Sequence, residues 1–400
     1  MKNKITFEYY KKGTKKGKLD KIIHNDYNFY FWDYEEQTKI KHLVLKEYFK
    51  LWSVILSKYH YVNYYDGFGG CGAYFDQISG EVDYGSPILA ISSTMENNTN
   101  HRCNFFISEK EPENIDNLKK IIAYKNLNDT NVFIEQGDFD TKINNFLDVL
   151  EKNPIPTFFL IDPYGINVKY ETLKRIMSIQ KTEILFNFMY NYLNRFLTKQ
   201  TSTSGISELY GTNDWIDLQK LTGFQKEKAL VDLFRNRLKE FTKFVYQYRL
   251  SFQNQNKTYY YLFHLTNNLK GISKMKDSFA SVNLGNIEFL GPNQPNPDQL
   301  CLIDQFEQKQ DAIKNDIFKT YKGKTIQFEN LLDENIDNTP YLEKQIHKTV
   351  SNMEGEYLDI KRIGETESGN LRTKGLKSQD IIEFYNEQKI IPKYEQQSLF

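Results

Sequence analysis

Closely spaced glycines follow the first short apolar segment of the chain, in Asp66-Gly67-Phe68-Gly69-Gly70-Cys71-Gly72. Glycine has no side chain, so backbone N–H groups in such a turn can approach a ligand closely. Acidic residues follow the next two apolar segments, at Glu109 and at Asp138-Phe139. Glu109 could accept hydrogen bonds from two ribose hydroxyls, and Asp138 from an adenine amino group that Phe139 covers. Either later acid alone would be better explained as a helix N-cap. Together, at consecutive strand ends, they favour a nucleotide-type cofactor site that includes Asp66, Gly67, Phe68, Gly69 and Gly70.

A second motif, Asp162-Pro163-Tyr164-Gly165, directly follows the most apolar run of the chain, at 158–161. The Asp162 carboxylate and the Pro163 carbonyl could accept hydrogen bonds from an exocyclic amino group, and Tyr164 could stack on a flipped base. The motif resembles the (Asp/Asn/Ser)-Pro-Pro-aromatic signature of methyltransferases that act on base amino groups, but it lacks the second proline. It is closer to the Asp-Pro-(Phe/Tyr)-Gly form of some guanine-amino methyltransferases of transfer RNA. A simple strand-to-turn transition is the alternative, and the lack of a Pro-Cys pair disfavours chemistry at cytosine carbon 5.

The elements that must position these residues alternate regularly. A helix is expected over 38–56 and another from 87, and then strands at 61–65, 104–107, 132–135, 157–161 and 183–189 alternate with helices at 114–124, 141–150 and 170–179. A helical insertion at 191–240 precedes a hairpin formed by 244–252 and 258–266. Buried strands that alternate with helices predict a parallel, doubly wound α/β sheet, and the final hairpin indicates the methyltransferase variant of the Rossmann-like layout. This first domain is expected to span 1–285.

A linker rich in proline and asparagine is expected at 286–300. Beyond it, helices at 310–321 and 326–332, a helix from Thr339-Pro340 to about 353, and strands at 357–363 and 370–376 predict a winged-helix domain over 301–380. Basic residues that could contact phosphates are Lys344, Lys348, Lys361 and Arg362. A small interaction domain with solvated lysines fits these residues equally well.

The tail at 381–400 ends in Gln396-Gln397-Ser398-Leu399-Phe400, which resembles the bacterial sliding-clamp-binding peptide. In such a peptide, Leu399 and Phe400 would enter an apolar pocket while Gln396 forms hydrogen bonds at its rim. The alternative is a tail that folds back onto its own domain.

Composition excludes several other classes of protein. The 52 Lys and Arg residues equal the 52 Asp and Glu residues, which argues against a histone-like, charge-driven binder. Cys71, Cys103 and Cys301 are far apart, so we expect neither a disulfide framework nor a metal site. The polar N-terminus and the short apolar runs indicate neither a signal peptide nor a membrane span. We expect a cytoplasmic protein.

These features together resemble the three-Cys-motif partner family. The resemblance covers about 30–280 and includes the helix around Lys41, the glycine turn, Gly85-Ser86-Pro87 and the motif at Asp162. It implies a methyltransferase-like fold from bacteria or phage, with S-adenosylmethionine as cofactor and with Lys41 and Ser86 among the cofactor-binding residues. It also implies a genetic neighbour with three clustered cysteines that resembles radical S-adenosylmethionine enzymes.

Our leading hypothesis is a methyltransferase that acts on a base amino group in nucleic acid, with DNA favoured over RNA. Asp162, Pro163 and Tyr164 would form its catalytic site. The alternative is a catalytically inactive, DNA-binding adaptor that recruits the radical enzyme and the sliding clamp.

Overall fold

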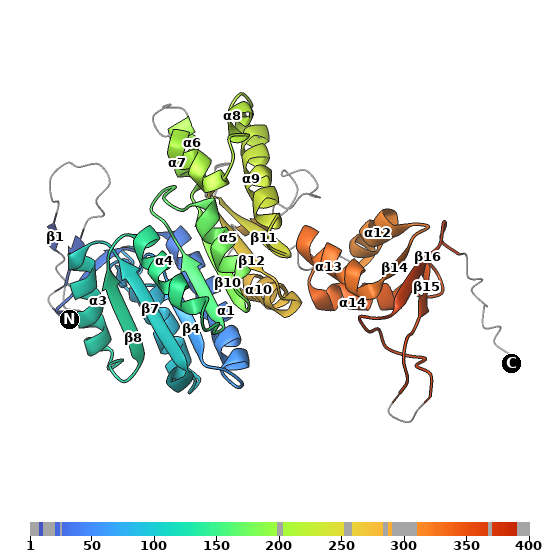
Figure 1. The fold of residues 1–400 in the computed structure, drawn as a ribbon, viewed down its shortest axis with the longest axis horizontal. Helices are drawn as coiled ribbons and strands as arrows, with labels where there is room; N and C mark the ends of the chain where they lie inside the picture. Colours follow the sequence, from blue (N-terminus) through green and yellow to red (C-terminus); the bar gives the residue numbers. More distant parts are fainter. Residues whose placement is uncertain are drawn as a thin grey trace. The chain divides into compact units, whose positions relative to one another are not determined.

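A computed structural model describes residues 8–10, 21–24, 26–197, 203–251, 258–282, 287–289, 310–366 and 370–389. The chain divides into two compact units, Met1–Leu290 and Gly291–Phe400 (Figure 1). No helix within the described ranges is long and apolar enough to cross a membrane.

The first unit is built on an eight-stranded sheet with the order β13-β11-β12-β10-β9-β4-β7-β8. Its strands are β4 (Val62–Asp66), β7 (Cys103–Glu109), β8 (Asn131–Gln136), β9 (Thr157–Ile161), β10 (Thr182–Phe188), β11 (Phe244–Ser251), β12 (Thr258–Thr266) and β13 (Ile287–Phe289). The strands from β10 to β8 in this order are parallel, whereas β12, β11 and β13 extend the sheet antiparallel. The predicted fold class, a mostly parallel Rossmann-like sheet with an antiparallel pair, is confirmed.

The register of the parallel strands brings their carboxyl ends together. Asp66, the last residue of β4, pairs with Ile107 of β7 and with Leu160 of β9. The glycine turn after Asp66 therefore begins between the ends of the two strands that lead to Glu109 and Asp162. We call this side of the sheet the carboxyl edge.

Helices cover both faces of the sheet because alternate strand residues are apolar on each face. One face carries α1 (Glu36–Leu56), α2 (Ser86–Glu96), α3 (Pro112–Tyr124) and α10 (Leu269–Ser281). The other face carries α4 (Phe139–Leu150), α5 (Tyr170–Ser178) and the predicted helical insertion, which consists of α6 (Tyr190–Leu197), α7 (Thr203–Tyr210), α8 (Trp215–Leu218) and α9 (Gly223–Lys239). Figure 1 shows the insertion helices gathered on one side of the sheet.

A second, five-stranded sheet had no clear signal in the sequence. Its order is β1-β2-β3-β5-β6, with β1 (Glu8–Tyr10), β2 (Lys21–Ile23), β3 (Tyr30–Asp33), β5 (Ala73–Phe75) and β6 (Val82–Tyr84). Because β5 directly follows the glycine turn and pairs with β3, the N-terminal segment is tied to the part of the fold that carries the glycine turn.

The second unit contains a three-stranded sheet of order β14-β16-β15 packed with helices. Its elements are α12 (Gln310–Tyr321), β14 (Thr325–Gln327), α13 (Phe328–Asn338), α14 (Glu343–Asn352), β15 (Leu358–Lys361) and β16 (Ile381–Phe384). Two predictions were wrong in detail. The third helix begins at Glu343 because the Thr339 side chain caps the end of α13 instead, donating to the Asn335 carbonyl at 2.7 Å. The strand paired with β15 is β16, which buries Ile382, whereas 370–376 forms one isolated bridge and leaves Leu371 76% exposed.

A buried carboxylate joins α1 to the sheet at the opposite end of the strands from the carboxyl edge. Glu183, near the start of β10, accepts hydrogen bonds from the Tyr48 hydroxyl, from Trp52 Nε1 at 3.3 Å and from His264 Nε2 at 3.1 Å. All four side chains are buried. Since unpaired buried donors are costly, this cluster fixes how α1 lies on the sheet.

We expect Glu183→Ala to lower the free energy of unfolding by about 3 kcal/mol or more. It removes the acceptor of the buried Trp52 and His264 donors and leaves the Tyr48 hydroxyl with a contact of 3.4 Å to the Gly271 carbonyl. Glu183→Gln should cost less, since its amide oxygen still accepts. Glu135→Ala is the matched control, because Glu135 is 57% exposed and pairs only with Lys142 at 3.3 Å, and it should change stability by less than about 0.5 kcal/mol. Urea unfolding measures all three, and equal losses for Glu183→Ala and the control would contradict the assignment.

Candidate functional site

Asp66 is the buried acid at the start of the glycine turn. Its Oδ2 accepts from the Tyr64 hydroxyl at 2.9 Å and from Ser86 Oγ at 2.7 Å, and its Oδ1 accepts from the Phe68 N–H at 3.1 Å. Burial raises the pKa of Asp66 to about 6, although these three hydrogen bonds act in the opposite direction. Ser86, which was predicted to bind the cofactor, therefore contacts the start of the turn through the Asp66 carboxylate.

The glycines of the turn are required by the packing of the protein itself. A Cβ at Gly69 would lie 2.5 Å from Ile107 Cγ2, and one at Gly67 would lie 2.7 Å from the Phe139 ring. Gly70 has a φ of +61°, which side-chain-bearing residues rarely adopt. These residues keep the backbone close to the ends of β7 and β9, so they shape the carboxyl edge.

Glu109 ends β7 and faces the glycine turn. Its Oε2 accepts from the Gly70 N–H at 2.7 Å, and its Oε1 accepts from the Glu111 N–H at 2.8 Å. A carboxylate has about four lone-pair positions, so each oxygen can accept one further hydrogen bond. The side chain is buried and fixed in orientation, and it fits the role of binding a vicinal diol such as that of a ribose.

Asp138 and Phe139 follow β8, but only one of them lies against the turn. Asp138 is exposed and caps α4, where its Oδ1 accepts from the Thr141 N–H at 3.0 Å, and this hydrogen bond lowers its pKa. Phe139 is buried and stacks on Phe68, with ring centroids 4.9 Å apart. The structure thus gives Asp138 the N-cap role and places the Phe139 ring at the glycine turn.

Asp162 is held from both sides. Its Oδ2 forms an ion pair with Lys41 Nζ of α1, and its Oδ1 accepts from Asn187 Nδ2 at 2.6 Å. The Lys41 ammonium also lies 5.9 Å from the centre of the Tyr260 ring. Burial and the charge of Asp162 raise the pKa of the Tyr260 hydroxyl. Lys41, predicted as a cofactor-binding residue, is therefore a partner of the acid in the second motif.

Sequence reasoning missed Asn187 and Tyr260. Asn187 is a polar residue near the end of β10, a strand in which every residue is buried, and that position is a usable signal. Tyr260 had no comparable signal because aromatic residues are frequent throughout this chain. Pro163 is buried, whereas Tyr164 is 61% exposed on the turn beside it.

Asn117 fastens the N-terminal sheet to the glycine turn. From α3, its Nδ2 donates to the Tyr30 and Cys71 carbonyls, both at 2.8 Å, and its Oδ1 accepts from the Tyr30 N–H at 2.8 Å. The ring of Trp32 consequently lies over Gly70, where an added Cβ would be 3.1 Å from it. The N-terminal segment forms one wall of the candidate cofactor site.

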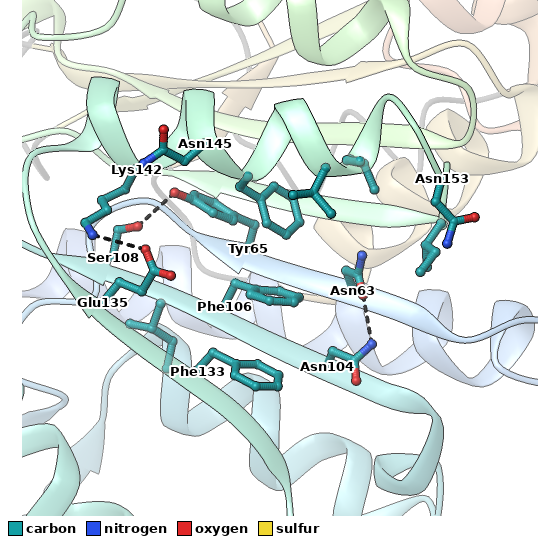
Figure 2. A pocket seen from close by; sticks show the side chains of 15 residues that line it. Asn63, Tyr65, Asn104, Phe106, Ser108, Phe133, Glu135, Lys142, Asn145 and Asn153 are labelled. Atoms are coloured by element: carbon teal, nitrogen blue, oxygen red, sulfur yellow. Dashed lines mark hydrogen bonds and ion pairs between the residues drawn. The ribbon is translucent and has the colours of Figure 1, made fainter.

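A separate groove of about 300 Å³ runs along the strands under α4 (Figure 2). Its floor is aromatic, and the rings of Phe106 and Phe133 stack there with centroids 5.0 Å apart. The polar groups at its ends pair with one another: Tyr65 with Ser108 at 2.8 Å, Asn104 with Asn63 at 3.0 Å and Lys142 with Glu135 at 3.3 Å. It contains neither Asp66 nor Asp162, so we place the candidate chemistry at the carboxyl edge instead.

The basic residues predicted to contact nucleic acid differ in their surroundings. Lys344 and Lys348 are exposed one turn apart on α14, and Lys361 is exposed on β15. Arg362 forms a bidentate ion pair with Glu354, with both N–O distances at 2.6 Å. This pair leaves fewer of its N–H groups available to bind a phosphate. The predicted clamp-binding residues Gln396, Leu399 and Phe400 lie outside the described residues.

The second unit is acidic. It contains 14 Lys and Arg residues against 19 Asp and Glu residues, whereas Met1–Leu290 contains 38 against 33. The helix α13 carries four of these acids and no basic residue: Glu329, Asp333, Glu334 and Asp337. In helix-turn-helix proteins the first helix of the pair crosses the phosphate backbone, so this composition disfavours a phosphate-driven duplex complex. Among the described parts of both units, no cluster of His, Cys, Asp and Glu could hold a metal ion.

We expect the raised pKa of Asp66 to appear in the pH dependence of stability. The folded protein binds the Asp66 proton more tightly than the unfolded chain, so the resulting stabilisation is complete below about pH 3.8 and is lost as the pH rises through about 6. Between pH 5 and pH 7.5 the unmodified protein should lose about 1 kcal/mol more than Asp66→Asn. Denaturant unfolding at both pH values measures this difference, and parallel losses in the two proteins would refute it.

Comparison with family models finds a match in the second unit. Residues 292–356 match the family model of the GMT-like wHTH domain. Comparison with curated proteins finds no relative.

Three solved structures are similar to part of this chain. Protein LPL1258 of Legionella pneumophila, of the family model DUF519, is 14% identical with a TM-score of 0.41, over 63% of this chain and 95% of that one. Spermidine synthase of Thermotoga maritima is 8% identical with a TM-score of 0.35, over 64% and 68%. A putative caffeoyl-CoA O-methyltransferase of Staphylococcus aureus is 9% identical with a TM-score of 0.29, over 55% and 82%. The chain thus combines a Rossmann-like α/β unit of the methyltransferase layout with a winged helix-turn-helix domain.

Proposed function

We propose that this chain is an S-adenosylmethionine-dependent methyltransferase that acts on an exocyclic amino group of a base in nucleic acid, with DNA favoured over RNA. One observation carries the proposal. The Asp162 carboxylate is fixed by Lys41 and Asn187 at the same carboxyl edge where Asp66 and Glu109 shape the glycine turn.

The cofactor half of the proposed site consists of the glycine turn and Glu109. Glu109 would accept hydrogen bonds from the ribose hydroxyls through the lone pairs of its carboxylate that do not already accept from backbone N–H groups. Phe139 and Phe68 would provide an apolar surface for the adenine. Bound S-adenosylmethionine supplies an electrophilic methyl group on its sulfonium centre.

The acceptor half consists of Asp162, the Pro163 carbonyl and Tyr164. Since Lys41 and Asn187 fix the carboxylate, its remaining lone pairs can orient a substrate amine without rearrangement. Asp162 and the Pro163 carbonyl would orient the amine toward the methyl group that the cofactor would supply, and the methylated amine would release one proton to solvent. No covalent nucleophile on the protein is needed, and the exposed Tyr164 ring would hold the base by stacking.

A second candidate function is that of a non-catalytic adaptor. The match of 292–356 to a winged helix-turn-helix domain favours it, as does the occupation of both Asp162 oxygens by other side chains. Such an adaptor would bring a radical S-adenosylmethionine-type partner to DNA, and its C-terminal peptide would bind the sliding clamp.

Calorimetry with S-adenosylmethionine separates the two functions. We expect the intact protein to bind the cofactor and Glu109→Ala to weaken binding by about 10- to 100-fold, because it removes a charged hydrogen-bond acceptor worth about 1.5–3 kcal/mol. Glu171→Ala, which removes an exposed carboxylate on α5, should bind like the unmodified protein. Lack of binding by the intact protein would reject the enzyme and leave the adaptor.

Transfer of labelled methyl groups to DNA and RNA from cells that lack the gene tests the acceptor half. We expect Asp162→Ala and Lys41→Met to lower incorporation by about 100-fold or more, because the amine loses its oriented acceptor. Cofactor binding by both variants should stay within about threefold of the unmodified protein. Lys174→Met, which changes an exposed lysine of α5, is the control. Full incorporation by Asp162→Ala would remove this residue from the mechanism.

A further inference from the structure

An exposed group of aromatic and basic side chains lies next to the acceptor motif. We call it the α6 shelf, and it consists of Tyr164, Tyr192, Arg195 and Phe196. The rings of Tyr192 and Phe196 have centroids 4.6 Å apart, and the Arg195 guanidinium lies 5.7 Å from the centre of the Tyr192 ring. Tyr164 is 61% exposed, Arg195 is exposed, and Tyr192 and Phe196 are half-buried.

The buried side of α6 fixes how this helix lies on the protein. Tyr190, Leu193 and Leu197 are buried in the core between the sheet and the insertion helices. Tyr192 and Phe196 are one helical turn apart and are partly buried against the same core, whereas Arg195 beside them is exposed, so the three side chains form one surface. This orientation is set by burial of the apolar positions and does not depend on a ligand.

The shelf is continuous with the acceptor motif. An added Cβ at Gly165 would lie 2.9 Å from Tyr192 Cε1, so the Tyr192 ring packs directly on the turn that carries Asp162 and Tyr164. Asn187, which holds Asp162, lies three residues before α6 on the same chain segment. A ligand whose amine reaches Asp162 would therefore place its neighbouring groups on the shelf.

We propose that the α6 shelf stacks the nucleotides that flank the target base, and that the substrate is single-stranded or locally unpaired nucleic acid. This inference rests on the proposed function and adds that the substrate is single-stranded or unpaired. Aromatic rings stack on any base, and an arginine can stack or contact phosphate, so such a surface binds single strands with little sequence preference. The excess of 38 basic over 33 acidic residues in Met1–Leu290 agrees with a polyanionic ligand.

The acidic second unit supports the same substrate. A duplex reader would be expected to bring positive charge to phosphates, but α13 carries only acidic charges and Arg362 is already paired with Glu354. The second unit keeps exposed basic side chains at Lys344, Lys348 and Lys361. The shelf is the surface that adjoins Asp162, and a base can reach it only when it is out of a duplex stack.

Fluorescence anisotropy with labelled oligonucleotides tests the proposal on the full chain. Single-stranded DNA, single-stranded RNA and a blunt DNA duplex of the same sequence serve as probes. We expect one or both single strands to bind at least about tenfold more tightly than the duplex. Tyr192→Leu and Phe196→Leu should each weaken single-strand binding by about 5- to 100-fold, the usual effect of losing one stacking ring.

Two controls keep the result interpretable. Tyr192→Phe retains the ring and should bind like the unmodified protein, whereas Phe133→Leu alters a 49% exposed ring in the groove under α4 and should have no effect. Circular dichroism confirms that each variant is folded. Tighter binding of the duplex, or unchanged single-strand binding by both leucine variants, would overturn the proposal. Ring-dependent strand binding in a protein that fails to bind S-adenosylmethionine would reject the methyltransferase function and retain the shelf.

Discussion

The arrangement of the site depends on the parallel pairing of β4 between β7 and β9. Because Asp66 is in register with Ile107 and Leu160, three strands end at the same level and deliver Asp66, Glu109 and Asp162 to one edge. Each acid then has a different environment. Asp66 is buried among hydroxyls, Glu109 is held by backbone N–H groups and Asp162 is held by an ammonium and an amide. Under the proposed function, these differences would let one carboxyl group shape the turn, another bind the cofactor and the third bind the acceptor.

The helix α1 links this edge to the opposite end of the sheet. Lys41, near its start, reaches Asp162, while Tyr48 and Trp52, two to three turns later, reach Glu183. A rotation or shift of α1 would disturb both contacts at once. The buried cluster at Glu183 would therefore help to fix Lys41 beside Asp162, although it lies at the opposite end of the strands. This coupling gives a structural reason for a polar cluster that has no part in the proposed chemistry.

Local patterns in the sequence were sufficient for the alternating strands and helices, the glycine turn, the three winged-helix helices in outline and β15, but not for β14 or β16. They were insufficient for contacts between distant segments. Lys41 and Asp162 are 121 residues apart, and nothing in the helical period around Lys41 indicates its partner. The N-terminal sheet was missed because its strands are three or four residues long and pair with a segment beyond the glycine turn. The motif at Asp138 left two roles open, and in the structure the side chain caps the start of α4.

The opposite charges of the two units have a consequence for handling the protein. The intact chain has no formal net charge at pH 7, yet Met1–Leu290 carries an excess of five positive charges and Gly291–Phe400 an excess of five negative ones. Net charge helps keep a protein in solution because like-charged molecules repel one another. Copies of either unit alone would repel one another in this way, whereas copies of the intact chain, which has no net charge, would not. Cleavage in the connecting segment would release fragments that migrate toward opposite electrodes and bind to opposite ion exchangers. Low ionic strength, which strengthens attraction between unlike units of neighbouring molecules, should be the condition under which the intact chain is least soluble.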